Sequence, residues 1–86
     1  MFMLSTQQQY DLITAIIADT NYKYRASIVY AGHELYQEGL QLKLFLLKAA
    51  MTPTPYFFIQ IPWKELHHEA QMLGFEAIAH RIRRFS

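Results

Sequence analysis

The chain contains no cysteine and only three glycines and three prolines. The lack of cysteine excludes disulfide scaffolds, thiolate zinc sites, iron–sulfur clusters and cysteine nucleophiles. It also fits a reducing compartment, so we expect a cytoplasmic location, or the host cytoplasm if the gene is viral. Because the glycines are scattered, they cannot form a loop that cradles a phosphate group.

Long apolar runs and strong net charge are also lacking. No run approaches the roughly 20 residues of a membrane-spanning helix, and residues 1–4 are too short for the apolar region of a signal peptide. We therefore expect no membrane association. Eight basic and seven acidic side chains give a net charge of +1. The one basic group without nearby acids is Arg81, Arg83 and Arg84 near the end of the sequence.

Apolar and aromatic residues are abundant for 86 residues. Half of the chain is hydrophobic, at 52%, and it holds six Tyr, six Phe and one Trp. This length and composition predict a single small globular domain over residues 1–86. The apolar content exceeds what so small a core needs, so we expect part of it to face a partner protein or a second copy of the chain.

The sequence opens with a helix signal. Ser5 and Gln8 form a Ser-x-x-Gln capping box, which predicts a helix starting after Ser5. Its apolar stripe contains Leu12, Ile13, Ile16 and Ile17. We expect the helix to end at about residue 18 or 19, where residues 19–21 read as a polar turn.

Two runs then alternate between apolar and polar residues, as strands do. In residues 22–31 the even positions are apolar or aromatic, and in residues 34–47 four leucines alternate from Leu40. Residues 31–33 predict the turn between them, with Gly32 at positive φ, while Gly39 suits a bulge or bend. Residues 34–51 are also rich in good helix formers, so a helix is the alternative for that stretch.

The remainder predicts a third strand and more helix. Pro53 and Pro55 indicate a stiff connector, and residues 56–61 form an apolar strand that is either central or beneath a helix. Pro62 then opens a helix, which Gly74 ends or kinks before residues 75–85 continue it. The predicted apolar stripes are Trp63, Leu66, Ala70 and Leu73 before Gly74, and Phe75, Ile78, Ala79 and Ile82 after it. The predicted class is α+β: an N-terminal helix, a small antiparallel sheet of two to three strands (about 22–31, 34–47, 56–61) and a C-terminal helix or helix pair.

Residues 65–69 contain the pattern that most resembles a chemical site. Glu65 and His68 share a helix face, and Glu-x-x-His is half of a carboxylate-bridged dimetal site, but the chain has no second copy. A solvated polar face is the competing interpretation, and a metal or enzyme centre on Glu65, His68 and Glu69 is the third hypothesis for function. His33 and His80 read as an ordinary turn residue and a helix-pair residue. We therefore expect no enzyme, metal or cofactor.

Aromatic and basic residues suggest binding instead. Tyr22, Tyr24 and Tyr30 would share one strand face, where they could pack in the core, contact a protein or stack with nucleic-acid bases. The three arginines could contact phosphates or acidic groups, or could simply complement the helix dipole.

These patterns together predict a small non-enzymatic interaction module. It would be an adaptor, regulator or inhibitor, for example of phage type, that binds a larger protein and also forms a homodimer. The alternative is a dimeric nucleic-acid-binding regulator that uses the C-terminal arginine helix. The predicted partner-binding residues are Tyr22, Tyr24, Tyr36, Trp63, Arg81, Arg83 and Arg84.

Overall fold

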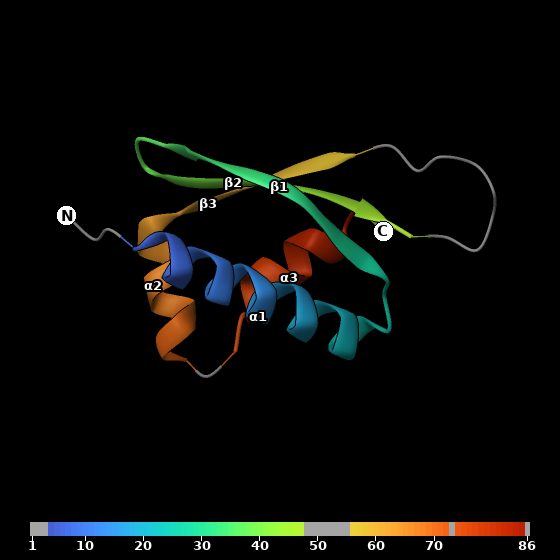
Figure 1. The fold of residues 1–86 in the computed structure, drawn as a ribbon. Helices are drawn as coiled ribbons and strands as arrows, with labels where there is room; N and C mark the ends of the chain where they lie inside the picture. Colours follow the sequence, from blue (N-terminus) through green and yellow to red (C-terminus); the bar gives the residue numbers. More distant parts are fainter. Residues whose placement is uncertain (1–3, 48–55, 73, 86) are drawn as a thin grey trace.

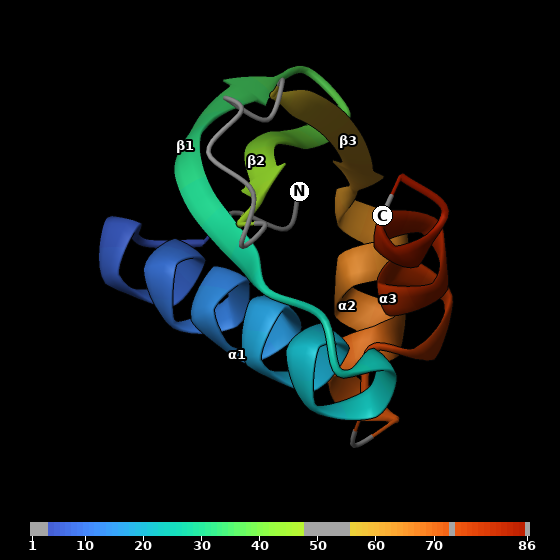
Figure 2. The same cartoon turned by 90° about the vertical axis from the view of Figure 1, so that its right-hand side faces the viewer.

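A computed structural model describes residues 4–47, 56–72 and 74–85 of the chain. The elements follow in the order α1 (Thr6–Tyr24), β1 (Ile28–Tyr36), β2 (Gly39–Leu46), β3 (Phe57–Pro62), α2 (Trp63–Gln71) and α3 (Glu76–Arg83). The strands form an antiparallel sheet in the order β1-β2-β3, and the helices lie on one side of it (Figure 1 and Figure 2). The predicted α+β class is confirmed. The proline connector at Pro53 and Pro55 lies outside the described residues.

One hydrophobic core fills the space between the sheet and the helices. Strand β2 supplies Leu40, Leu42 and Leu44 at alternate positions, and each is fully buried. This confirms strand rather than helix for the leucine-rich run. The other buried apolar residues are Ile13, Ile16, Ile28, Ile59, Ile61, Leu66, Phe75, Ile78, Ala79 and Ile82. Since every element contributes to this set, its burial orients all six elements.

Helix α1 begins as the sequence predicts but extends further. The Ser5 hydroxyl accepts from the Gln8 N–H, and the Gln8 side chain accepts from the Ser5 N–H. The predicted end at residue 18 or 19 is wrong, because the helix runs to Tyr24 and is capped by Arg25 with φ of 49°. Thr20 continues the buried stripe, with its hydroxyl bonded to the Ile16 carbonyl at 2.7 Å. Because Thr20 is polar, the pattern of apolar residues does not show that the buried face of the helix continues beyond Ile17.

Asn21 fixes where the first strand starts. Its side-chain oxygen accepts from the Ile28 N–H at 2.8 Å, and its side-chain nitrogen donates to the Ile28 carbonyl at 3.0 Å. Asn21 thus pairs with Ile28 as a neighbouring strand would. The predicted first strand over residues 22–31 is consequently displaced to Ile28–Tyr36.

We predict that Asn21→Ala lowers the free energy of unfolding by about 1–2 kcal/mol, because two backbone groups lose their partner. Asn21→Asp keeps an acceptor for the Ile28 N–H but cannot donate to its carbonyl, so its loss should be smaller. Urea denaturation of the two variants and the wild-type chain measures both effects. Equal stability of Asn21→Ala and wild type would contradict this account.

The hairpin turn also lies elsewhere than predicted. Gln37 and Glu38 form the turn between Tyr36 and Gly39, whereas residues 31–33 stay within β1. Gly32 does have positive φ, at 147°, but it serves a β-bulge, since the register shifts between Tyr30 and Gly32. A glycine in a bulge and a glycine in a turn leave the same signal in a sequence.

The C-terminal part agrees with the prediction in outline. β3 is an edge strand and not the central one, but it does lie beneath helices, as the second option stated. Two separate helices follow, and the predicted apolar stripe of α3 is buried. In α2 the predicted stripe is wrong at Ala70, which is exposed, whereas Glu69 beside it is buried; Leu73 of that stripe lies outside the described residues. Within the described residues, no helix combines the length and hydrophobicity needed to cross a membrane.

Candidate functional site

The predicted binding residues do not form one surface. Tyr22 and Tyr24 lie on the last turn of α1, not on a strand with Tyr30, so the predicted three-tyrosine stacking face does not exist. Tyr22 is 87% exposed. The Arg83 guanidinium lies over the half-buried Tyr24 ring, 4.9 Å from its centroid. The ends of α1 and α3 therefore bring Tyr24 and Arg83 together, whereas Tyr22, two positions before Tyr24, lies on a different face of the helix.

Tyr36 and Trp63 lie near the opposite end of the sheet. Tyr36 ends β1 and is half-buried. Trp63 begins α2, packs against the core, and donates its backbone N–H to the Glu38 carbonyl at 2.8 Å. Both residues therefore support the fold at the hairpin turn, which leaves only part of each ring open to a partner.

Arg81 is held within the molecule. Its Nη1 contacts both carboxylate oxygens of Glu65, at 2.6 Å to Oε1, and its Nη2 donates to the Gln60 carbonyl at 2.7 Å. One guanidinium thus joins α3 to α2 and to the outer edge of β3. Arg84, three residues later, is exposed. The arginine cluster therefore divides into one structural cation and two that reach the surface region.

We predict that Arg81→Ala lowers the free energy of unfolding by about 1–2 kcal/mol. It leaves the partly buried Glu65 without its cation and the Gln60 carbonyl without its donor. Arg84→Ala is the matched control and should change stability by less than about 0.5 kcal/mol. Thermal and urea unfolding of the two single variants decide between these expectations. Equal effects would show that Arg81 has no special structural role.

The Glu-x-x-His pattern on α2 also has a structural use. Glu69 is buried, and its Oε1 accepts from the Ile78 N–H at 3.0 Å, in the first turn of α3. Asp19 of α1 accepts from the Phe75 N–H at 3.3 Å beside it. These carboxylates replace the side-chain cap that α3 itself lacks. The solvated-face interpretation is therefore wrong for Glu65 and Glu69, and the described part of the chain holds no cluster of metal-ligand residues.

The sheet face opposite the helices carries an aromatic group that the sequence reasoning missed. We call Phe45, Tyr56 and Phe58 the outer aromatic patch. Tyr56 is 54% and Phe58 52% exposed. The Phe45 and Tyr56 rings meet edge to face with centroids 5.5 Å apart, and Lys43 Nζ lies 4.3 Å from the Tyr56 centroid. Strand alternation could have indicated this face, because Phe45 lies between Leu44 and Leu46 and therefore points away from the side on which the leucines are buried.

His33 is part of a polar network and not a turn residue. Its Nδ1 lies 2.7 Å from the Tyr30 hydroxyl and its Nε2 lies 3.2 Å from Gln9 Oε1. The Gln9 side-chain nitrogen donates to the Leu4 carbonyl at 3.0 Å, which leaves Gln9 Oε1 free to accept from His33. The order of donors is therefore Tyr30 to His33, His33 to Gln9, and Gln9 to Leu4. This chain of bonds ties the start of α1 to β1.

Stability should fall in alkaline solution. Burial raises the pKa of Tyr30, with a further contribution from Tyr10, and burial followed by the Glu38 charge raises the pKa of Tyr36. Their stabilising effect is complete below the unfolded value of 10.0 and is lost as pH rises through the higher folded pKa. Urea unfolding at about pH 9 and about pH 11 tests this. In the double variant Tyr30→Phe with Tyr36→Phe, the free energy of unfolding should fall less between these two pH values. An equal fall in the variant and in wild type would contradict the assignment to these tyrosines.

The described residues present two aromatic groups at the surface and no assembled catalytic group. The outer aromatic patch lies on the sheet, and the tyrosine–arginine group lies at the ends of α1 and α3. Comparison of the chain with models of known families, with curated proteins and with solved structures found no match.

Proposed function

We propose that this chain is a small non-enzymatic interaction module, an adaptor, regulator or inhibitor, that binds a larger protein through the outer aromatic patch. The observation that supports this is the one-sided arrangement of the fold. All three helices lie on one side of the sheet (Figure 1 and Figure 2). Tyr56 and Phe58 alternate with the buried residues of β3, which places them on the other side, and each is about half exposed. Aromatic side chains are enriched at the centres of protein interfaces, and Tyr is frequent among the few residues that carry most of the binding energy.

The patch has the composition of an interface centre. Phe45 supports Tyr56 edge to face, so the tyrosine ring is held in place before binding and loses little freedom on contact. Lys43 and the Gln41–Gln60 pair, joined by a 3.2 Å hydrogen bond, give it a polar border. A phage-type inhibitor acting in the host cytoplasm fits this proposal, as does homodimerisation through the same patch.

The test compares two surfaces. Tyr56→Ser with Phe58→Ser removes the patch, and Tyr22→Ser removes the most exposed tyrosine of α1. Wild-type protein and both variants are used as bait in lysate of the source cells, after circular dichroism has shown that each is folded. We expect one larger protein to be retained by wild type and Tyr22→Ser but not by the double variant. If wild type and the double variant retained the partner and Tyr22→Ser did not, binding would belong to the end of α1 and the outer aromatic patch would be excluded as the binding surface.

Nucleic acid is the alternative partner, favoured by cations beside exposed rings. Lys43 lies over Tyr56, and Arg84 lines one hollow with Phe58 and Phe85. Aromatic rings next to cations bind single strands by stacking and charge. Fluorescence anisotropy of labelled single- and double-stranded DNA at two salt concentrations tests it with Lys43→Ala and Arg84→Ala, which spare the structural Arg81. Binding that weakens steeply with salt and is lost in the variants supports this alternative. No binding at low salt rejects it.

A further inference from the structure

The two edges of the sheet differ in how far their backbone groups are satisfied. On the β3 edge the Gln60 carbonyl accepts from Arg81, and Pro62 has no N–H to offer. On the β1 edge Asn21 satisfies both backbone groups of Ile28. For the other residues of β1, the strand register determines which backbone groups point toward the open edge.

The register shows which β1 groups point away from β2. The two-residue turn is closed by Tyr36 and Gly39, so this pair exchanges backbone hydrogen bonds. Bonded pairs then alternate, which turns the N–H and C=O of Leu35 and His33 toward the open edge. Gln60 confirms this phase across the sheet, since its carbonyl points outward to Arg81. Within the described residues these edge groups of His33 and Leu35 have no partner.

The N-terminal part of helix α1 lies beside this open edge. Its N-terminal turns extend past β1 on the side away from β2 (Figure 2). Tyr10 of these turns is 45% exposed, with its ring centroid 5.2 Å from that of His33. A strand added to β1 at His33 would therefore rest its inward side chain near the Tyr10 ring.

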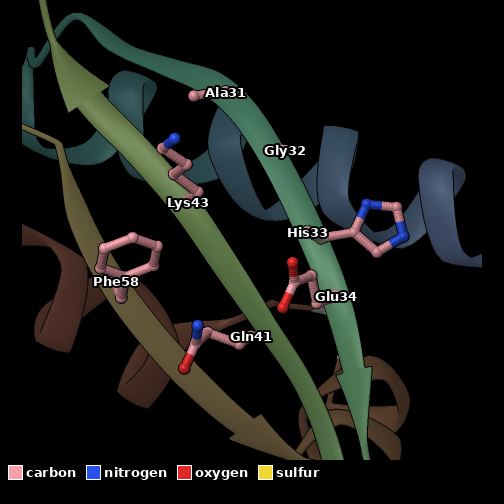
Figure 3. A pocket seen from close by; sticks show the side chains of 7 residues that line it. All are labelled: Ala31, Gly32, His33, Glu34, Gln41, Lys43 and Phe58. Carbon is pink, nitrogen blue, oxygen red and sulfur yellow. The ribbon is translucent and has the colours of Figure 1, made fainter.

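Opposite charges line the other face of the same edge. Glu34 is exposed, and two positions before it Gly32 pairs with Lys43 of β2. A side chain built on Gly32 would touch nothing within 4 Å, so there is open space between the edge and Lys43. Figure 3 shows Glu34, Gln41, Lys43 and Phe58 around this hollow, with His33 directed away from it. An added strand would meet an acid at Glu34 and a base two positions away.

We propose that the edge of β1 from Gly32 to Leu35 binds an extended peptide of a partner protein as a fourth, antiparallel strand. Its recognition pattern is a cationic residue opposite Glu34, an apolar residue opposite His33, and an anionic residue opposite Gly32 that reaches Lys43. The backbone groups select an extended chain, and the three side chains set its direction and register. The backbone edge of β1 lies outside the outer aromatic patch, although Lys43 borders both and Phe58 lines the hollow beside the edge, so the proposal goes beyond the function given above.

The bulge limits the length of the pairing. The register shifts between Tyr30 and Gly32, and a bulge bends the strand that carries it. An added strand can therefore pair regularly with β1 only on the side of the bulge from Gly32 to Leu35. Binding should therefore be weak and direction-selective, with a dissociation constant on the order of 10–100 µM.

The probe is a synthetic peptide, acetyl-Thr-Val-Lys-Phe-Glu-Val-Thr-amide, titrated into the isotope-labelled full chain and followed by NMR. A second peptide exchanges Lys and Glu, and a third carries an N-methyl group on Phe. We expect the first to shift the amide signals of His33 and Leu35, the second to bind at least about fivefold more weakly, and the third not to bind. Absence of shifts in β1, or equal binding of the N-methylated peptide, would overturn the proposal.

A charge-reversed protein supplies the second test. Glu34→Lys combined with Lys43→Glu exchanges the two charges at the edge and also removes the Lys43 contact with the Tyr56 ring, and it should reverse the preference between the first two peptides. An unchanged preference would overturn the recognition pattern. Tyr22→Ser, which changes neither the β1 edge nor the outer aromatic patch, should bind the first peptide as wild type does. The peptide titration tests the β1 edge, and the lysate experiment tests the outer aromatic patch. Either proposal can therefore fail while the other is supported.

Discussion

Gly39→Ala is expected to lower the free energy of unfolding by about 3 kcal/mol, a large part of the stability of a domain this small. A methyl group at Gly39 would lie 2.1 Å from the Ile61 carbonyl oxygen and 2.7 Å from the Pro62 Cα. Both atoms belong to the β3 backbone, so no side chain can turn aside to make room. Strands β2 and β3 would have to separate where the sheet meets α2.

Gly74→Ala is the matched control for this prediction. A methyl group at Gly74 meets nothing within 4 Å, and positive φ occurs only at Gly32 among the described glycines. Alanine there should leave stability unchanged or raise it by about 0.5 kcal/mol, because it restricts the unfolded chain. Calorimetry of the two variants separates the contact from the loss of glycine flexibility. Similar melting temperatures for both would refute the contact.

Glu69→Ala is expected to lower the free energy of unfolding by about 2 kcal/mol. The buried carboxylate accepts from the Ile78 N–H in the first turn of α3, and a charged acceptor makes a strong hydrogen bond. Without it, a donor at the start of α3 stays unsatisfied inside the protein. Glu69→Gln keeps an oxygen at this position and should recover about half of the loss. Urea denaturation measures all three proteins.

Glu76→Ala provides the comparison with an exposed glutamate of the same helix. Glu76 pairs with Lys23 at the surface, where its side chain is mostly exposed. Its removal should change the free energy of unfolding by about 0.5 kcal/mol or less. If Glu76→Ala and Glu69→Ala proved equally destabilising, the capping role assigned to Glu69 would be wrong.

The functional surfaces were harder to predict than the fold because they depend on distant neighbours. Arg81 was predicted to contact a partner, yet its guanidinium is held by Glu65 and Gln60, which lie 16 and 21 residues earlier. In the sequence Glu65 and Glu69 resemble part of a metal site, but in the structure their carboxylates bind Arg81 and the Ile78 N–H of α3. In contrast, the outward position of Phe45 followed from strand alternation once the buried leucines were recognised.

The sequence by itself determined those features that depend on near neighbours. These are the capping box at Ser5, the buried alternation of β2, the apolar stripe of α3 and the α+β class. Only the tertiary structure decided where α1 ends, where the hairpin turns and which charges are structural. Asn21 joined to Ile28 holds the start of β1, and burial of Thr20 keeps α1 helical beyond its polar residues. Such contacts form only when separate segments meet, so composition and period cannot reveal them.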